Sequence, residues 1–239
     1  MEGFEAYVNG FVGEVTPSLS VVIVLGKEII YAKDFGRADG SRDMAATPDT
    51  VYQWGSVTKI ATAAAIMQLH EKGLIDLDAQ VSRYLDYFPA QYPITVRHLL
   101  SHSSGLSEPP DFEWVNVRLN GTPMPDLDLV DRAYYEELTG LMFEPGSDSA
   151  YVNSDYVTLG QIVAKVSGKP YIQYIQENIL TPLGMKTTDF TYKSDAMIKN
   201  VASCAVLATE AEAMIATMDE VRGLGDGADF FGESDDQYA

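Results

Sequence analysis

A serine and a lysine three positions apart are the first residues in this chain whose types and spacing could do chemistry. Ser56 and Lys59 lie at the expected start of a helix, where this spacing places the hydroxyl and the ammonium on one face. The N-terminus of a helix carries a positive potential that favours a developing oxyanion. A lysine can activate a serine only when desolvation or a nearby cation lowers the lysine pKa toward neutrality. The pattern predicts a nucleophilic serine beside a buried lysine, whereas the ordinary alternative is a surface lysine in a first helical turn.

The flanks of this pair make the prediction more specific. Two common residue types at one offset meet by chance in many chains, but this is the only Ser-x-x-Lys among the 239 residues. Gly55 supplies a tight turn immediately before the serine, and the small residues of 61–65 follow in the helix. A narrow, Ala-rich helix can be buried on all sides, which would hold the pair rigidly.

A Tyr-x-Asn motif, Tyr151 to Asn153, is the second candidate. A phenol can relay a proton when nearby cations stabilise the phenolate, and an amide can orient both a lysine and a substrate carbonyl. The same motif occurs at Tyr7 to Asn9, so it is not diagnostic alone. The later copy is favoured because it precedes a helix that Asn153 or Ser154 could cap, whereas the earlier copy precedes the first strand.

Two β-rich apolar runs, residues 19–25 and 28–35, predict a hairpin with Gly26 in the first turn position. Few other strands are evident downstream. A two-stranded hairpin is marginal in water, so it needs sheet partners that the chain does not obviously supply. An unpaired sheet edge would favour a homo-oligomer.

The rest of the chain is predicted to be helices and loops. Helices are expected at 57–72, at 154–166 and from Pro170 to about 179, with a loop-rich patchwork between 76 and 146. In the first helix the apolar face is expected to comprise Ile60, Ala63, Ala64 and Met67. The pattern is typical of an α+β fold, in which a helical region packs on an antiparallel sheet.

The C-terminal part is predicted to be separate from this domain. Residues 1–194 are expected to form the main domain, and residues 195–239 a helix followed by a flexible acidic tail. A capping box from Thr209 to Glu212 predicts where that helix begins, and it should end near Arg222.

The composition excludes several function classes. A formal net charge of −19 argues against nucleic acid or an anionic membrane as a partner. The apolar stretches fall well short of the roughly 20 residues needed to span a membrane. No secretory signal is evident at the start of the sequence, which favours a cytoplasmic location, or a periplasmic or secreted one if a signal has been removed.

The histidines and the cysteine do not predict a metal site. Cys204 is the only cysteine, which excludes an intramolecular disulfide. His98 and His102 have the i, i+4 spacing of a helical pair, but no HExxH pattern surrounds them and the segment is apolar. A structural role is therefore expected for both, and neither a metal nor another cofactor is predicted.

Four segments, in this order, resemble the serine β-lactamase and penicillin-binding superfamily. The closest branch contains class C β-lactamases, D-alanyl-D-alanine peptidases and family VIII carboxylesterases, and the resemblance covers roughly residues 19–190. The segments are VYQWGSVTKIATAAAIMQLHEKGLIDLDAQVSRYL, ITVRHLLSHSSGL, FEPGSDSAYVNSDYVTLGQIVAKVSGK and ILTPLGM. The resemblance implies that Ser56 is acylated, that Lys59 and Tyr151 share the proton transfers, that Asn153 positions substrate, and that HLLSHSSGL is scaffold.

One family motif is missing from the sequence. Members carry Lys-Thr-Gly, His-Thr-Gly or a close variant on a C-terminal strand, and no Lys or His followed by Ser/Thr-Gly occurs here. That strand supplies one oxyanion-hole donor, and losing one such donor slows turnover about 100- to 1,000-fold. The sheet is therefore expected to be C-terminally incomplete, through truncation, divergence or completion by a partner chain.

Together these patterns predict a serine hydrolase that forms an acyl-enzyme on a small ester or amide, of carboxylesterase or β-lactamase type. Ester chemistry is slightly favoured over lactam hydrolysis, because the missing signal fits poorly with periplasmic substrates. The alternative is a non-catalytic or truncated protein of the same fold, which binds its ligand or is acylated by it without efficient turnover.

Overall fold

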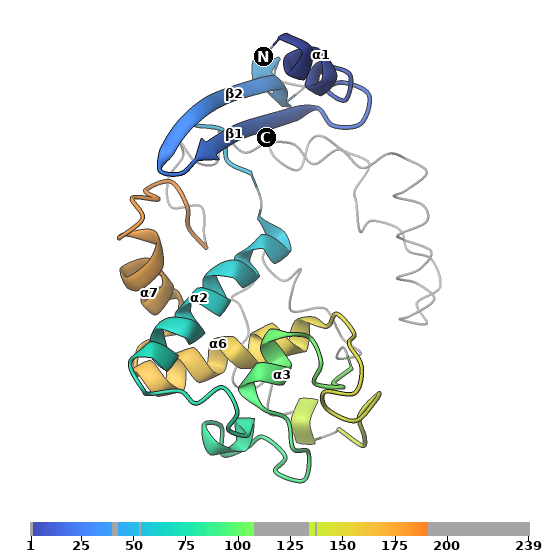
Figure 1. Ribbon diagram of the computed structural model, residues 1–239, viewed down its shortest axis with the longest axis vertical. Helices are drawn as coiled ribbons and strands as arrows, with labels where there is room; N and C mark the ends of the chain where they lie inside the picture. The colour runs from blue at the N-terminus through green and yellow to red at the C-terminus, as the bar shows by residue number, and fades with distance from the viewer. Residues whose placement is uncertain (1, 40–42, 53, 108–133, 137, 191–239) are drawn as a thin grey trace. The chain divides into compact units, whose positions relative to one another are not determined.

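The computed structural model describes residues 2–39, 43–52, 54–107, 134–136 and 138–190 (Figure 1). The chain divides into two compact units, one of Trp54–Thr188 and one of Met1–Gln53 with Asp189–Ala239. We call them the helical unit and the hairpin unit. The predicted domain boundary at 194/195, the Thr209 capping box with its helix, the acidic tail and Cys204 lie outside the described residues.

The hairpin unit contains the predicted strand pair. Strand β1 (Ser18–Leu25) pairs antiparallel with β2 (Glu28–Asp39), and β2 pairs with the two-residue β3 (Met44–Ala45), in the order β1-β2-β3. The turn lies where the sequence predicted it, with Gly26 at a φ of 64° that glycine adopts without steric cost. Neither β3 nor the N-terminal helix α1 (Glu2–Asn9) was predicted.

Most apolar side chains of the hairpin are exposed. The exposed fraction exceeds one half for Val22, Val24, Ile29 and Ile30. Among the described residues of this unit, the buried apolar side chains are Val8, Phe35 and Ala38. The hairpin unit therefore builds little core from its own side chains.

The helical unit is built around helix α6 (Asn153–Ser167), which packs against α2 (Thr58–Glu71), α3 (Val96–Leu100) and α7 (Tyr171–Ile175) (Figure 1). Short 3₁₀ turns occur at Gly55–Val57 and Val81–Arg83, and a π-helical turn, Gln176–Leu180, follows α7. Helix α6 ends at Gly168, whose φ of 69° is typical of a helix C-terminus. The predicted helices are therefore present, with ends shifted by one or a few residues.

The predicted apolar face of α2 is wrong. The side chains buried in the structure are Ala61, Thr62, Ala65, Ile66 and Leu69, whereas Ile60 is 70% exposed and Met67 is 42% exposed. Apolar residues occur all round this helix, so periodicity alone does not select the face that meets its neighbours. A polar residue lies on the buried face because the Thr62 hydroxyl pairs with the Tyr171 hydroxyl at 2.7 Å.

Helices combined with a three-stranded antiparallel sheet agree with the predicted α+β class. Within the described part of the chain, no helix is both long enough and apolar enough to cross a membrane.

Candidate active site

Ser56 and Lys59 are held where the chain enters α2. Gly55 has a φ of 50°, and the 3₁₀ turn that contains it runs directly into the helix. This turn leaves Ser56 exposed and Lys59 half-buried, with the Lys59 Nζ donating to the Ser56 Oγ at 3.1 Å. The local geometry is the one that the spacing of three predicted, but Lys59 is only partly buried, whereas the sequence predicted a buried lysine.

Tyr151 and Asn153 reach the same point from the segment that leads into α6. The Tyr151 hydroxyl lies 2.5 Å from the Lys59 Nζ and 2.5 Å from the Ser56 Oγ. The Asn153 Oδ1 accepts from the Lys59 Nζ at 2.6 Å. The structure therefore brings all four predicted site residues together within hydrogen-bonding distance.

The predicted cap of α6 is wrong. Helix α6 begins after Val152, which is extended, and neither Asn153 nor Ser154 caps the helix. The Asn153 oxygen is engaged by the Lys59 ammonium, and the Ser154 hydroxyl donates to the Ser107 carbonyl at 3.0 Å. The side chains that could cap the helix instead connect it to α2 and to the 101–107 loop.

The earlier Tyr-x-Asn copy lies in a different environment. Tyr7 is in α1 of the hairpin unit, where its side chain is 67% exposed and packs edge-on against Phe11 at a centroid distance of 5.0 Å. The later copy is thus the one found beside Ser56.

Aromatic rings surround the Lys59 ammonium. Its Nζ lies 4.6 Å from the centroid of the Tyr151 ring and 5.6 Å from that of Tyr156, distances at which a cation is attracted to a ring face. Burial raises the pKa of Tyr156, as do the nearby Asp155 and Tyr151. Tyr156 therefore stays protonated at neutral pH and donates its hydroxyl hydrogen to the Leu100 carbonyl at 3.1 Å.

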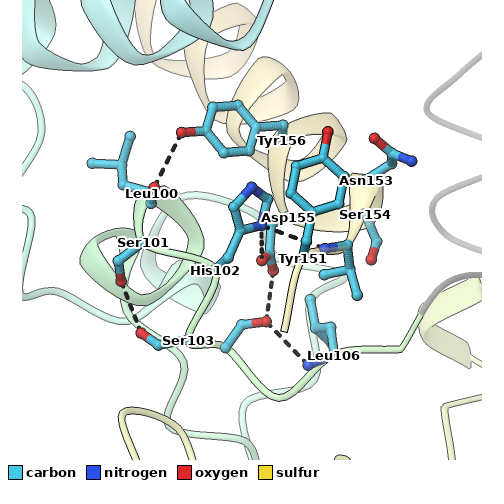
Figure 2. A network of polar contacts seen from close by, with 12 residues as sticks. Leu100, Ser101, His102, Ser103, Leu106, Tyr151, Asn153, Ser154, Asp155 and Tyr156 are labelled. Atoms are coloured by element: carbon cyan, nitrogen blue, oxygen red, sulfur yellow. Dashed lines mark hydrogen bonds and ion pairs between the residues drawn. The ribbon is translucent and has the colours of Figure 1, made fainter. Parts of the chain in front are cut away.

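A second polar cluster lies next to these rings. His102 Nδ1 lies 2.9 Å from Asp155 Oδ2, and the Ser104 hydroxyl donates to Asp155 Oδ1 at 2.6 Å (Figure 2). The Asp155 side chain is fully buried. Burial lowers the pKa of His102, and the charge of Lys59 lowers it further.

The sequence offered only weak signals for this cluster. The spacing of His102 from His98 is that of a helical pair, but the apolar segment around both predicts a scaffold role. Asp155 looked like an ordinary acidic residue in the first turn of a helix, where such residues are common. Among the described residues, no group of three His, Cys, Asp or Glu side chains is arranged to hold a metal ion.

Comparison with known proteins identifies the family. The family model described as Beta-lactamase matches residues 4–225. The putative penicillin-binding protein PbpX of Bacillus subtilis (strain 168) is 36% identical over 190 residues, which cover 79% of this chain and 46% of that protein. The chain therefore belongs to the β-lactamase family, as the resemblance predicted.

Solved structures agree with this assignment. The octameric penicillin-binding protein homologue from Pyrococcus abyssi has a TM-score of 0.71 and 32% identity, with 87% of this chain and 48% of that chain covered. EstCE1, a hydrolase with promiscuous acyltransferase activity, has a TM-score of 0.67 and 29% identity, with 87% and 56% covered. The β-lactamase-like fold class is thus confirmed, and the chain spans about half the length of the relatives it matches.

Proposed function

We propose that this chain is a serine hydrolase in which Ser56 attacks a small ester or amide and forms an acyl-enzyme. One observation carries the proposal: the Ser56 Oγ, the Lys59 Nζ and the Tyr151 Oη form a closed triangle of hydrogen bonds. A nucleophile whose hydroxyl contacts a group able to take its proton is an arrangement that suits covalent catalysis, and Ser56 contacts two such groups.

The triangle also sets the proton balance of the reaction. As the bond from Oγ to the carbonyl carbon forms, the proton of Ser56 passes to Tyr151 or Lys59. This transfer requires the pair to hold one proton fewer than an ammonium plus a phenol. When the bond to the leaving group breaks, the same proton passes to the departing oxygen or nitrogen, and a water molecule then hydrolyses the acyl ester by the reverse route.

Asn153 acts on the lysine and, we propose, also on the substrate. Its oxygen accepts from the Lys59 Nζ and so fixes the position of the ammonium. An amide also carries two donor hydrogens on its nitrogen, which suit a substrate carbonyl oxygen. Replacement of Asn153 should therefore weaken both substrate binding and acylation.

An ester is the first substrate class to test. Alcohols and phenols leave more readily than amines, so ester cleavage depends less on a complete set of oxyanion donors. One of the matched structures, EstCE1, is described as a hydrolase with acyltransferase activity, which also requires an acyl group to be held between donor and acceptor.

The test is burst kinetics with a p-nitrophenyl ester and with a chromogenic cephalosporin. Wild type and a control variant, Ser147→Ala, should release one equivalent of product rapidly, and Ser56→Ala should not. Ser147 suits the control because it is an exposed serine of the same unit whose hydroxyl donates to the Glu144 carbonyl. Equal rates for wild type and Ser56→Ala would contradict the proposed function.

The second candidate is a protein that is acylated without efficient turnover. It is favoured by the lack of a Lys or His followed by Ser/Thr-Gly anywhere in the sequence. Labelling with a fluorescent penicillin and a fluorophosphonate separates the alternatives. Label on Ser56 without turnover supports this candidate, whereas the absence of any label indicates a non-catalytic binding protein.

We further propose that the chain self-associates. Among the described residues β1 pairs only with β2, and a strand edge without a partner in those residues is a surface on which a second copy could pair. The matched protein from Pyrococcus abyssi is described as octameric. Sedimentation velocity should detect a species larger than the monomer, and a monomer at all concentrations would contradict this proposal.

A further inference from the structure

The ring of His102 packs on both tyrosines that surround the Lys59 ammonium. Its centroid lies 4.6 Å from that of Tyr151 and 5.0 Å from that of Tyr156, and both ring planes are tilted by 39°. Figure 2 shows the imidazole beside these two rings, with Asp155 on the side of its Nδ1. Tyr151 is 57% exposed, and the ring of His102 packs against one side of its ring.

Asp155 fixes the orientation of the imidazole. A carboxylate can only accept a hydrogen bond, so the 2.9 Å contact places a hydrogen on His102 Nδ1. The Val152 amide nitrogen approaches the same ring nitrogen at 3.5 Å, but the shorter contact decides the tautomer. The Ser104 hydroxyl, which donates to Asp155, accepts in turn from the Leu106 amide at 3.0 Å.

The backbone of His102 also holds the segment that carries Tyr151. The His102 carbonyl accepts from the Ala150 amide at 2.9 Å, directly before Tyr151. His102 itself has a φ of 55°, in the left-handed region that non-glycine residues adopt uncommonly, asparagine, aspartate and histidine more often than the others. A residue in a strained conformation within a satisfied hydrogen-bond network is a candidate for a functional role.

We propose that His102 is a positioning residue. Its ring packs against Tyr151 and holds the phenol against Ser56 and Lys59, and the hydrogen bond to Asp155 fixes the orientation of the His102 ring. The consequence for the rate rests on the proposed function, but the consequence for the position of Tyr151 does not. The ionisable groups facing His102 are Lys59 from α2, Tyr151 before α6, and Asp155 and Tyr156 from α6. Burial and the charge of Lys59 lower the pKa of His102, so the ring that packs on Tyr151 is neutral at pH 7.

The decisive variant is His102→Asn. Asparagine tolerates the left-handed backbone, and its amide N–H can replace the Nδ1–H toward Asp155 while the ring is lost. We expect a midpoint of urea unfolding close to that of wild type. The limiting rate of labelling by a fluorophosphonate should fall about 10- to 100-fold, because small misplacements of a catalytic group have effects of that size. The half-saturating probe concentration should change little.

His70→Asn is the matched control. His70 lies in α2 of the same unit, and its Nδ1 contacts the Ile75 carbonyl at 2.8 Å, outside the site. This variant should be labelled at the wild-type rate. A wild-type rate for His102→Asn as well would overturn the kinetic part of the proposal, since a merely structural histidine would behave in that way.

A second measurement does not depend on activity. In protein containing 3-fluorotyrosine, the ¹⁹F line of Tyr151 can be assigned from its loss in Tyr151→Phe. The line should shift or broaden in His102→Asn and stay unchanged in His70→Asn. An unchanged line in His102→Asn would overturn the positioning proposal, whether or not wild type is reactive. The proposed function fails by a different result, namely equal labelling of wild type and Ser56→Ala.

Discussion

The two units of this chain differ in how far they bury their apolar side chains. In the hairpin unit Val22 and Ile29 are exposed, by 59% and 67%, whereas in the helical unit Ile66, Leu159 and Ile162 are completely buried. All four predicted site residues belong to the helical unit. The candidate site therefore depends on the unit that builds its own core, which is why two segments distant in sequence can meet there so closely.

The polar interactions of the two units differ in the same way. In the hairpin unit Lys33 pairs with Glu5 at 2.5 Å while both side chains remain partly exposed. In the helical unit the fully buried Asp155 is satisfied by His102 and Ser104. Exposed ion pairs contribute little to stability, whereas a buried carboxylate is tolerated only when its partners are in place.

The largest expected effect compares one substitution in the two units. Ile66→Ala should lower the free energy of unfolding by about 2 to 5 kcal/mol, because it removes fully buried methylenes and leaves a cavity. Ile29→Ala, in β2, should change it by no more than about 0.5 kcal/mol. Urea unfolding followed by far-UV circular dichroism measures both. Equal losses would show that the hairpin buries this face in solution.

The sequence predicted the chemistry of the site better than its supports. Ser56, Lys59, Tyr151 and Asn153 could be selected because motifs record residue types at fixed offsets, and the structure brings these residues together. The hairpin was also predictable, since two runs rich in β-branched residues on either side of a Gly turn are typical of a hairpin. These are local properties, which the sequence encodes directly.

The missed features depend on tertiary contacts. The buried face of α2 is set by the Tyr171 hydroxyl and by α6, neither of which can be inferred from an Ala-rich helix. Asn153 does not cap α6 because a lysine 94 positions away in sequence takes its oxygen. For His102 the sequence predicts a scaffold role, because nothing local indicates that its partner is Asp155.

The next effect compares two glycines with positive φ, one in each unit. At Gly105 (φ 78°) a Cβ would lie 2.2 Å from the Phe143 carbonyl oxygen, whereas at Gly26 (φ 64°) it would meet nothing within 4 Å. Both alanine variants incur the left-handed strain of roughly 1 to 2 kcal/mol. Gly105→Ala should lose about 1 to 3 kcal/mol more through the steric clash. Thermal unfolding distinguishes them, and equal losses would mean that the loop around Phe143 yields freely.

Replacing a buried carboxylate and an exposed one should have a smaller effect on the free energy of unfolding. Asp155 accepts hydrogen bonds from His102 and Ser104. Asp155→Asn replaces one accepting oxygen with an NH₂ group, so one of these two donors loses its acceptor. The free energy of unfolding should therefore fall by about 1 to 3 kcal/mol. The control, Asp78→Asn, removes an exposed partner of Arg97 within the helical unit and should leave the unfolding midpoint unchanged. Urea titrations of the two variants test this difference. A loss with Asp78→Asn as large as that with Asp155→Asn would show that burial is not what makes Asp155 costly to replace.

The smallest expected effect is a pH dependence that should arise mainly in the helical unit. Burial lowers the pKa of His98, and burial together with the charge of Lys59 lowers that of His102, while in the unfolded chain both lie near 6.5. Between the lowered values and 6.5 the unfolded chain binds more protons, so stability is complete above about pH 6.5 and declines as the pH falls. The pKa of Glu5 in the hairpin unit is lowered by its hydrogen bond to Lys33, so the contribution of Glu5 is lost only at more acidic pH.

Urea midpoints measured at several values between about pH 7.5 and about pH 5.5 should therefore fall in wild type and fall less in His102→Asn, with His98 accounting for the remainder. Glu5→Gln should keep the wild-type slope over this range, because its carboxyl group stays ionised throughout. The opposite result would be a pH slope of the urea midpoint that decreases in Glu5→Gln and stays at the wild-type value in His102→Asn. That result would assign the pH response to the hairpin unit. It would also show that His102 is not a neutral ring in the folded state.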